Sequence, residues 1–590
     1  MKDFLKYTLA SIVGVFVSFF ILSVMFFFFF VFFLASMQLT TVEDIPANSV
    51  LEIKLNYVVE ERALQSFNAV SSFPFVSIRK EPGLNEIVKT IRKAKYDSDI
   101  RGIYLNLNNF VCGGYTVVDV IRKELKEFKK SGKFIIAFGD DVTQKAYYFA
   151  SVADKIFITP EGSIEFKGLG FEQMYFKNTL DKLGIEAQIF KAGKFKSAVE
   201  IFSNTKMSDA DRQQNTELIN SIYSYMLNEM SAVKNISVDS LKLFADNLLL
   251  QYPENAYKLK MIDSIIYKDQ CLNYLKQISG IKSNGKVKLV RLENYALAKL
   301  KQQPASSKRI AVIYAVGEIL NTYGDQSTIG IENIPAAIKK AREDSRVKAI
   351  VLRVDSPGGD PTTSDIVWRE IEITKKIKPV IVSMGRVAAS GGYYISCGAD
   401  TIVAEPTTLA GSIGVYGIIP NMQGFFNNKL GITFDRVTTG KYSDYFSLNR
   451  PLRADESKIV QSRIDKIYET FVSKVSIGRK MTYEEINEIA QGRVWSGLQA
   501  KDVGLVDVLG GLDDAIKIAA TKAKVSGYSV VEYPALKSLV ESILEDFPAE
   551  VKADLLQKEL GGQYKYYQYL NRIKNYVGFQ ARLPFDMEVY

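Results

Sequence analysis

The sequence predicts an α/β protein in which two tandem repeats follow an N-terminal transmembrane helix. The stretch Gly83–Ser98 recurs as Gly330–Ser345, and both ends of the two stretches lie 247 positions apart. In each copy, apolar runs typical of strands alternate with segments of helical periodicity. Such alternation predicts βαβ units and a largely parallel sheet covered by helices.

An apolar run near the N-terminus predicts the transmembrane helix. It extends from about Thr8 to Leu34 without a charged side chain, and at about 1.5 Å per residue it exceeds a hydrocarbon core of roughly 30 Å. We expect an uncleaved signal anchor at residues 1–36. The alternative is a cleaved leader ending at the small residues Ala35 and Ser36; however, the apolar region of such leaders is only about 7–15 residues long.

The basic residues around this run predict its orientation. Lys2 and Lys6 precede the run, and the next basic residue is Lys54. The positive-inside rule therefore places the N-terminus in the cytoplasm and the bulk of the chain outside it. We expect a single-pass protein of the bacterial inner membrane, with its folded repeats on the extracytoplasmic, periplasmic side.

The two repeats are expected to span residues 48–300 and 308–533. Each begins with a strand-like run, residues 50–55 and 310–314, and the polar, aperiodic segment Lys301–Lys308 is the best boundary between them. Residues 534–590 have no counterpart in the first repeat and form a C-terminal tail, whose role the sequence leaves open.

The composition excludes several classes of active site. The chain of 590 residues has no histidine, which removes a Ser-His-Asp triad and every His-ligated metal site. The cysteines Cys112, Cys271 and Cys397 form no CxxC pair and are better explained as buried core residues than as nucleophiles. The net charge is +9, and the acidic and basic residues are interspersed along the chain, so we expect no nucleic-acid partner. We also expect neither a metal nor another cofactor.

Ser390 is the candidate nucleophile of the second repeat. We predict a strand at 349–354, and the segment that follows it contains Gly358 and Gly359. A second strand is predicted at 380–384, followed by a turn at 385–387 and a helix that starts after Ser390. The Gly391 amide at that helix start suits an oxyanion, and Gly359 could supply a second donor. The alternative reading of this small-residue segment is an ordinary tight helix start.

Lys196 is the candidate base, because without histidine a serine hydroxyl needs another proton acceptor. In the repeat register, Ser390 corresponds to Gln144 and Lys196 corresponds to Ser443, so each copy keeps one half of a possible pair. To act at neutral pH the lysine pKa must fall by roughly three units, about 4 kcal/mol against the charged form. Burial between domains or under substrate would supply that decrease.

Five motifs together resemble the long, tandem form of the signal peptide peptidase A (protease IV) family, in the ClpP/crotonase superfamily. The resemblance covers roughly residues 1–533. The matching stretches are Asp355–Gly359, Gly385–Tyr394, Leu409–Val415, Gly492–Gly497 and, in the first copy, Gly193–Glu200.

This resemblance implies two tandem ClpP/crotonase-like repeats that act as a membrane-anchored serine endopeptidase. It gives Ser390 the role of nucleophile, Lys196 that of general base, and the amides of Gly359 and Gly391 that of oxyanion hole. Ser412 resembles the hydroxyl that orients the lysine. The implied substrates are cleaved signal peptides and other apolar peptides, hydrolysed through an acyl-enzyme. The implied assembly is a homo-oligomeric ring, for which a tetramer is one candidate.

Two other functions remain open at the level of sequence. One is a catalytically silent, membrane-tethered scaffold that binds peptides, since one fold can host unrelated functions. The other is an acyl-thioester enzyme of the crotonase type, which the expected extracytoplasmic orientation disfavours. The sequence also leaves open whether Lys196 meets Ser390 within one chain or between chains.

Overall fold

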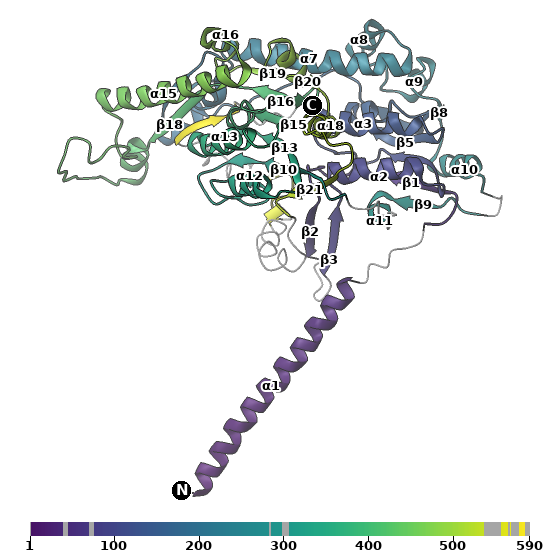
Figure 1. Ribbon diagram of the computed structural model, residues 1–590, viewed down its shortest axis with the longest axis horizontal. Coiled ribbons are helices and arrows are strands. Elements are labelled where there is room, and N and C mark those ends of the chain that lie inside the picture. Colours follow the sequence, from purple (N-terminus) through teal and green to yellow (C-terminus); the bar gives the residue numbers. More distant parts are fainter. Residues whose placement is uncertain are drawn as a thin grey trace.

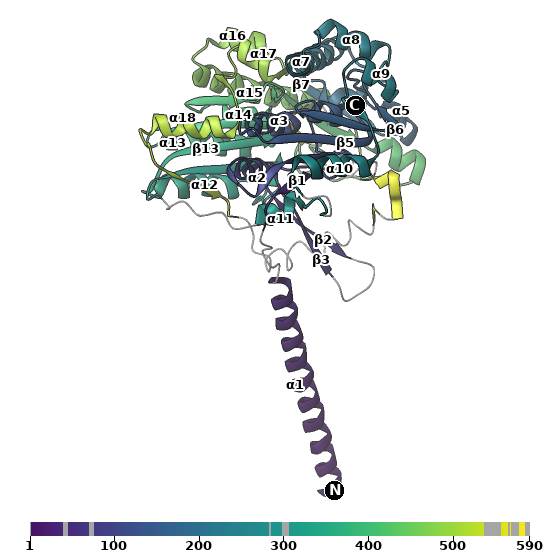
Figure 2. The same cartoon turned by 90° about the vertical axis from the view of Figure 1, so that its right-hand side faces the viewer.

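The computed structural model describes residues 2–38, 45–69, 76–281, 285–297, 306–535, 556–557, 559–564, 567 and 578–583. Helix α1, Lys2–Gln38, extends as one rod away from the folded body (Figures 1 and 2). Within it, Lys6–Phe29 is long and apolar enough to cross a membrane, and none of its most apolar stretch is buried. The predicted apolar helix is therefore present.

The first repeat is built on a parallel six-stranded sheet in the order β8-β6-β5-β4-β1-β9. Its strands are β1 (Ser49–Ile53), β4 (Ile100–Asn106), β5 (Phe134–Val142), β6 (Lys155–Ile164), β8 (Ser264–Ile265) and β9 (Leu289–Arg291). Helices between them include α2 (Leu84–Tyr96), α3 (Tyr115–Lys129) and α4 (Gln144–Ala150).

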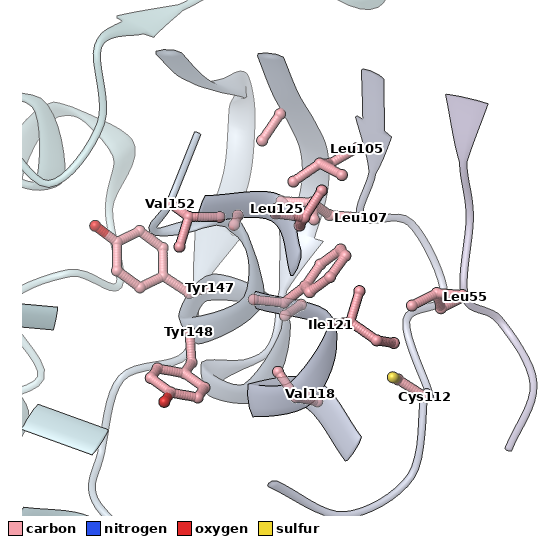
Figure 3. Packing of buried hydrophobic residues seen from close by; sticks show 14 of the residues in the cluster. Leu55, Leu105, Leu107, Cys112, Val118, Ile121, Leu125, Tyr147, Tyr148 and Val152 are labelled. Atoms are coloured by element: carbon pink, nitrogen blue, oxygen red, sulfur yellow. The ribbon is translucent and has the colours of Figure 1, made fainter. Parts of the chain in front are cut away.

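Apolar periodicity explains how these helices cover the sheet. On α2 the buried side chains Ile87, Ile91 and Ala94 recur every three or four residues, so they form one face. Leu105 and Leu107 from the β4 region meet Ile121 and Leu125 of α3 in one core (Figure 3). The same core includes the Tyr147 and Tyr148 rings of α4.

The second repeat forms an eight-stranded sheet whose main path is β19-β17-β15-β13-β10-β21; off this path, β16 pairs with β15 and β20 pairs with β16. The bounds are β10 (Arg309–Val316), β13 (Val347–Ser356), β15 (Val380–Ala389), β16 (Thr401–Ala404), β17 (Leu409–Gly411), β19 (Val494–Ser496), β20 (Val508–Leu509) and β21 (Ser529–Tyr533). Its main helices are α12 (Asn333–Glu343), α13 (Pro361–Lys375), α14 (Gly391–Ser396), α15 (Ala454–Arg479) and α18 (Leu512–Lys522).

The recurring stretches of sequence occupy matching places in the two sheets. Helix α2 precedes β4, as α12 precedes β13, and α4 follows β5, as α14 follows β15. The tandem α/β architecture predicted from the sequence is confirmed. The predicted domain limits remain predictions, and most of the expected boundary at 301–308 lies outside the described residues.

The predicted turn at 385–387 is wrong. Strand β15 continues through it to Ala389, with a register irregularity against β13. The Asp355 carboxylate accepts hydrogen bonds from the Val387 amide at 3.0 Å and from Arg386 Nε at 2.8 Å. These bonds keep the chain extended, and from Val387 onward it pairs with β17.

A third sheet joins the two repeats, in the order β12-β11-β14-β22-β18-β7. Its strands are β7 (Glu186–Ala192), β11 (Glu318–Ile319), β12 (Thr328–Ile329), β14 (Gly358–Gly359), β18 (Val415–Asn421) and β22 (Gly578–Arg582). Strand β7 belongs to the first copy and lies antiparallel to β18 of the second over its whole length. This pairing brings the chain that follows β7 into the second repeat.

Candidate active site

Ser390 lies at the sharp junction between β15 and α14. Its φ of 55° and ψ of −116° are unusual for a residue with a side chain. The Ser390 amide donates to Gly411 O at 2.7 Å, and the Ser390 carbonyl accepts from the Tyr394 amide at 2.8 Å. These bonds hold a strained backbone, of a kind that clusters at functional sites.

Lys196 reaches Ser390 from the first repeat of the same chain. After β7 the chain turns at Gly193, whose φ is +112°, and the Phe195 amide donates to Gln491 O at 2.7 Å. The Lys196 amine then lies 2.8 Å from Ser390 Oγ. Both side chains are fully buried. The predicted pair is thus brought together within one chain.

Ser412 holds the amine from another side. Lys196 Nζ donates to Ser412 Oγ at 3.0 Å and to Ser412 O at 3.1 Å. Among the described residues, the hydrogen-bond partners of this amine are therefore hydroxyl and carbonyl oxygens. Burial lowers the lysine pKa well below its usual value, because the charged form loses its hydration. An amine in this state can accept a proton from a neighbouring hydroxyl.

Gly358, Gly359 and Gly391 pack closely against neighbouring atoms in the chain around Ser390. Gly359 has a φ of +152°, and a Cβ there would lie 2.0 Å from Ile319 O. A Cβ on Gly358 would lie 2.6 Å from the Gly391 amide nitrogen. Only glycine fits at Gly358 and Gly359, and Gly358 lies close to the backbone of Gly391.

Lys196 is held in position by two contacts that were not predicted from the sequence. Ser197, the next residue, donates to the buried Asp211 carboxylate at 2.6 Å, and burial raises the pKa of Asp211. A Cβ on Gly492 would lie 2.7 Å from Lys196 Cβ. Asp211 lies in the first turn of the long helix α7 (Asp209–Lys234). Acidic residues are common in the first turn of a helix, so the sequence did not indicate that Asp211 supports the site.

A buried ion pair also joins the repeats behind the site. Arg353 of β13 donates to both oxygens of Glu61, at 2.7 and 2.9 Å, and to Met384 O at 2.8 Å. Arg386 bridges Asp355 and Glu60 nearby. The loop at 60–61 therefore supports β13 and β15, the strands that lead to Gly359 and Ser390. Nothing in the local sequence distinguished Glu61 from surface acids.

The residues that correspond to Ser390 and Lys196 in the opposite repeat make other contacts. Gln144 is buried at the start of α4, where its Oε1 accepts from the Lys167 and Gly168 amides, both at 2.9 Å. Ser443 is exposed, and its Oγ accepts from the Gly440 amide at 3.0 Å. Neither position lies at the Lys196–Ser390 contact.

The three cysteines are buried and unpaired with one another. Burial raises the pKa of each thiol to about 12. Since the thiolate is the nucleophilic form, a cysteine nucleophile is disfavoured, in agreement with the expectation that these are core residues.

Comparison with known proteins places both repeats in one family. The model of "Peptidase family S49" matches residues 127–282 and 372–526. The chain is 36% identical to "Protease 4" of Salmonella typhi over 81% of this chain and 78% of that protein. It is 33% identical to the chloroplastic serine protease SPPA of Arabidopsis thaliana, over 81% of this chain and 69% of that protein.

Two further matches complete the comparison. "Protease 4" of Haemophilus influenzae is 34% identical over 74% of this chain and 72% of that protein. Among solved structures, a ClpP1 variant from Listeria monocytogenes matches 35% of this chain and 94% of its own, with 17% identity and a TM-score of 0.24.

Proposed function

The chain belongs to peptidase family S49 and is a serine protease, and we propose that it hydrolyses peptide bonds with Ser390 as nucleophile and Lys196 as general base. The observation that carries this proposal is the 2.8 Å contact between Lys196 Nζ and Ser390 Oγ. The enzyme class expected from the sequence is confirmed by the family. The scaffold and thioester-enzyme alternatives gain no support from its relatives.

In the proposed first step, the neutral Lys196 amine takes the Ser390 hydroxyl proton while Oγ attacks the substrate carbonyl carbon. The ammonium then donates that proton to the leaving amine, and an acyl-enzyme remains. Water, deprotonated by the same amine, hydrolyses the ester and restores Ser390. Burial of Lys196 supports these steps, because it favours the neutral amine in the resting enzyme.

We assign the tetrahedral oxyanion to the Gly359 and Gly391 amides. Gly391 is the first residue of α14, so its N–H is free of the helix hydrogen-bond ladder. Donors of this kind typically contribute about 10²–10³ in kcat. Ser412 is assigned to orientation of the amine, supported by its two contacts with Nζ.

We propose cleaved signal peptides and other apolar peptides as substrates, and α1 as a membrane anchor. Lys6–Phe29 supports the anchor by length and hydropathy. With Lys2 and Lys6 on the cytoplasmic side, the repeats would face the periplasm. A protease held beside the bilayer would meet peptides left in it at high local concentration.

We also propose a homo-oligomeric ring. Residues 425–450 project from the body beyond β18 (Figure 1). This arm exposes large apolar side chains, including Leu430, Ile432, Phe434 and Val437. An exposed patch of this kind is typical of a contact surface. The first copy's equivalent segment packs on the second copy through β7, so a neighbouring chain is the natural partner for the second copy's arm.

Loss of peptide hydrolysis in Ser390→Ala and in Lys196→Met, with both variants folded, tests the proposed dyad. Full activity in either variant would remove it.

A further inference from the structure

Helix α7 of the first repeat carries a buried glutamine that contacts two segments around the proposed catalytic centre. The helix lies against β19 of the second repeat (Figure 1). Gln214, in its second turn, is only 1% exposed. Its Oε1 accepts from the Val494 amide of β19 at 2.9 Å, and its Nε2 donates to Ser197 Oγ at 3.4 Å. One side-chain amide therefore joins the residue after Lys196 to a strand of the second repeat.

The hydrogen bonds around Gln214 give each polar group one role. Asp211 accepts from Ser197 Oγ at 2.6 Å and from Asn215 Nδ2 at 3.1 Å. Because the Ser197 hydroxyl donates to Asp211, its lone pairs can accept from Gln214 Nε2. The Val494 amide fixes the orientation of the glutamine, since only Oε1 can accept its proton. All four side chains are buried, where an unpaired polar group is costly. The network therefore has a defined arrangement.

On one side, this network holds the backbone that carries Lys196. Ser197 directly follows the lysine and begins the short 3-10 turn Ser197–Val199. Its hydroxyl is bound by the side chains of Asp211 and Gln214 on α7, so its position relative to the helix is fixed. The Lys196 amine lies 2.8 Å from Ser390 Oγ. A displacement of Ser197 would therefore move the amine away from the hydroxyl.

On the other side, the network holds the backbone that carries the two serines. Val494 is paired with Gly411 across β17 and β19. The neighbouring Arg493 carbonyl accepts from the Ser412 amide at 2.7 Å, and the Gly411 carbonyl accepts from the Ser390 amide at 2.7 Å. The strand held from α7 is thus bonded directly to the segment of Ser412, and through Gly411 to Ser390.

The second repeat has no glutamine at the matching position. Its helix α15 has 26 residues, as α7 does, and each helix follows the Gly-Lys pair of its own copy, at 193–194 or 440–441. The sixth residue of α7 is Gln214, and the sixth residue of α15 is Ile459, which is 44% exposed. The bridging amide is therefore found in the copy that carries the lysine and not in the copy that carries the serine.

We infer that Gln214 is a positioning residue of this protease, which holds Lys196 at a fixed distance from Ser390. This inference rests on the proposed function. Gln214 acts through the Ser197 hydroxyl and the Val494 amide, and not by contact with the reacting atoms. Misplacement of a catalytic group by about 1 Å costs roughly 100-fold in rate. Because the two members of this dyad come from different repeats, a bridge between the repeats beside the dyad controls that distance.

Two other contacts hold α7 against the second repeat. Ser221 Oγ lies 2.7 Å from Ser496 Oγ, and Glu217 forms an ion pair with Arg493. In the described part of the chain, neither Glu217 nor Ser221 has a hydrogen bond to residues 193–197. Replacement of Gln214 should therefore leave the repeats docked and release the segment of Lys196.

The test compares the full chain with its Gln214→Met variant, whose side chain has a similar length but no amide. The readouts are kcat and KM for a short fluorogenic peptide, the dependence of kcat/KM on pH, and the rate of Ser390 labelling by a fluorophosphonate. We expect kcat at pH 7 to fall by about 10- to 100-fold, while KM stays within about twofold of the wild type. The plateau of kcat/KM should move to higher pH, because a displaced amine regains hydration of its charged form.

Two control variants on the same helix separate positioning from stability. Gln213→Met makes the same substitution at the preceding, exposed position and should retain the wild-type kcat. Leu218→Ala opens a cavity in the core of the first repeat. It should lower the melting temperature but leave kcat and the pH profile of the folded enzyme unchanged.

A second variant decides the question even where Gln214→Met fails to fold. Ser197→Ala removes the link to the Lys196 segment and keeps the bond between Gln214 and Val494, and it should lower kcat and shift the pH profile in the same direction. In a Ser412→Ala background, Gln214→Met should cost less than in the wild type, because both residues act on the same amine.

Two results would overturn the inference and leave the proposed function intact. One is a wild-type kcat and pH profile in Ser197→Ala, and the other is a fully additive loss in the Ser412→Ala, Gln214→Met double variant. Absence of hydrolysis and of labelling in every form, the wild type included, would overturn the proposed function itself, and the inference with it.

Discussion

The Lys196 amine contacts the Ser390 hydroxyl at 2.8 Å although the two residues lie 194 positions apart in the chain. Strand β7 makes this contact possible, because it leaves the first repeat and pairs with β18 of the second. Neither repeat alone holds both groups. The catalytic centre proposed for this protease is therefore a product of the fusion of two copies.

Peptide hydrolysis should depend on deprotonation of Lys196. Because burial lowers the pKa of this amine, the neutral form should already dominate well below pH 10. We expect kcat/KM to rise with pH and to reach a plateau well below the ordinary lysine pKa of about 10.4. A profile that still climbs tenfold per pH unit above pH 9 would contradict a lowered pKa.

Replacement of Lys196 by Met should make the protein more stable. Below the unfolded pKa the unfolded chain binds a proton at this lysine more readily than the buried amine does, so the stability of the fold decreases, by up to about 1.4 kcal/mol for each unit by which burial lowers the pKa. For the wild type this loss is absent above the unfolded pKa and grows as pH falls toward the folded pKa. Thermal or denaturant unfolding at pH 7 should show the Met variant above the wild type, and the gap should narrow at pH 10. A Met variant less stable than wild type at pH 7 would count against burial as the source of the shift.

Gly492→Ala should lower kcat by displacing Lys196. Its Cβ would lie 2.6 Å from the Lys196 amide nitrogen and 2.7 Å from Lys196 Cβ, so the lysine must shift. A displacement of about 1 Å costs roughly 100-fold in rate. Gly504→Ala is the control, because Gly504 has a similar φ of +81° but its Cβ would meet Met481 Sδ at 3.4 Å. Both variants should lose stability, and only Gly492→Ala should lose kcat; equal activities would refute this positioning role.

Glu61→Gln should lower the free energy of unfolding, because it removes an ion pair that joins the two repeats. It leaves Arg353, which is buried, without its ionic partner, and removal of one member of a buried pair typically costs about 3–5 kcal/mol. Glu127→Gln, in an exposed pair with Lys130, should cost less than about 1 kcal/mol. Urea unfolding of the two variants measures the difference. Similar, small losses in both would show that the Glu61–Arg353 pair contributes little.

The sequence was informative where a local pattern determines the structure. Alternating apolar runs predicted the strands and helices, and the small residues around Ser390 predicted the strand-to-helix junction. The repeat comparison indicated Lys196, because a lysine in one copy replaces a serine in the other. Each of these signals is contained in a short stretch of residues.

Features that depend on distant contacts were not predictable in this way. The continuation of β15 through 385–387 depends on the Asp355 carboxylate, and the buried state of Glu61 depends on Arg353, 292 positions away. The return of the tail to β14 and β18 is similarly long-range. No periodicity within Gly578–Arg582 indicates which strands it joins.

The most direct test of the proposed dyad is the rate at which a fluorophosphonate labels Ser390 in the wild type, Ser390→Ala and Lys196→Met. We predict labelling of the wild type, none in Ser390→Ala, and a rate at least about 100-fold lower in folded Lys196→Met, as expected on loss of a general base. Labelling of Lys196→Met at the wild-type rate would contradict the transfer of the Ser390 proton to Lys196.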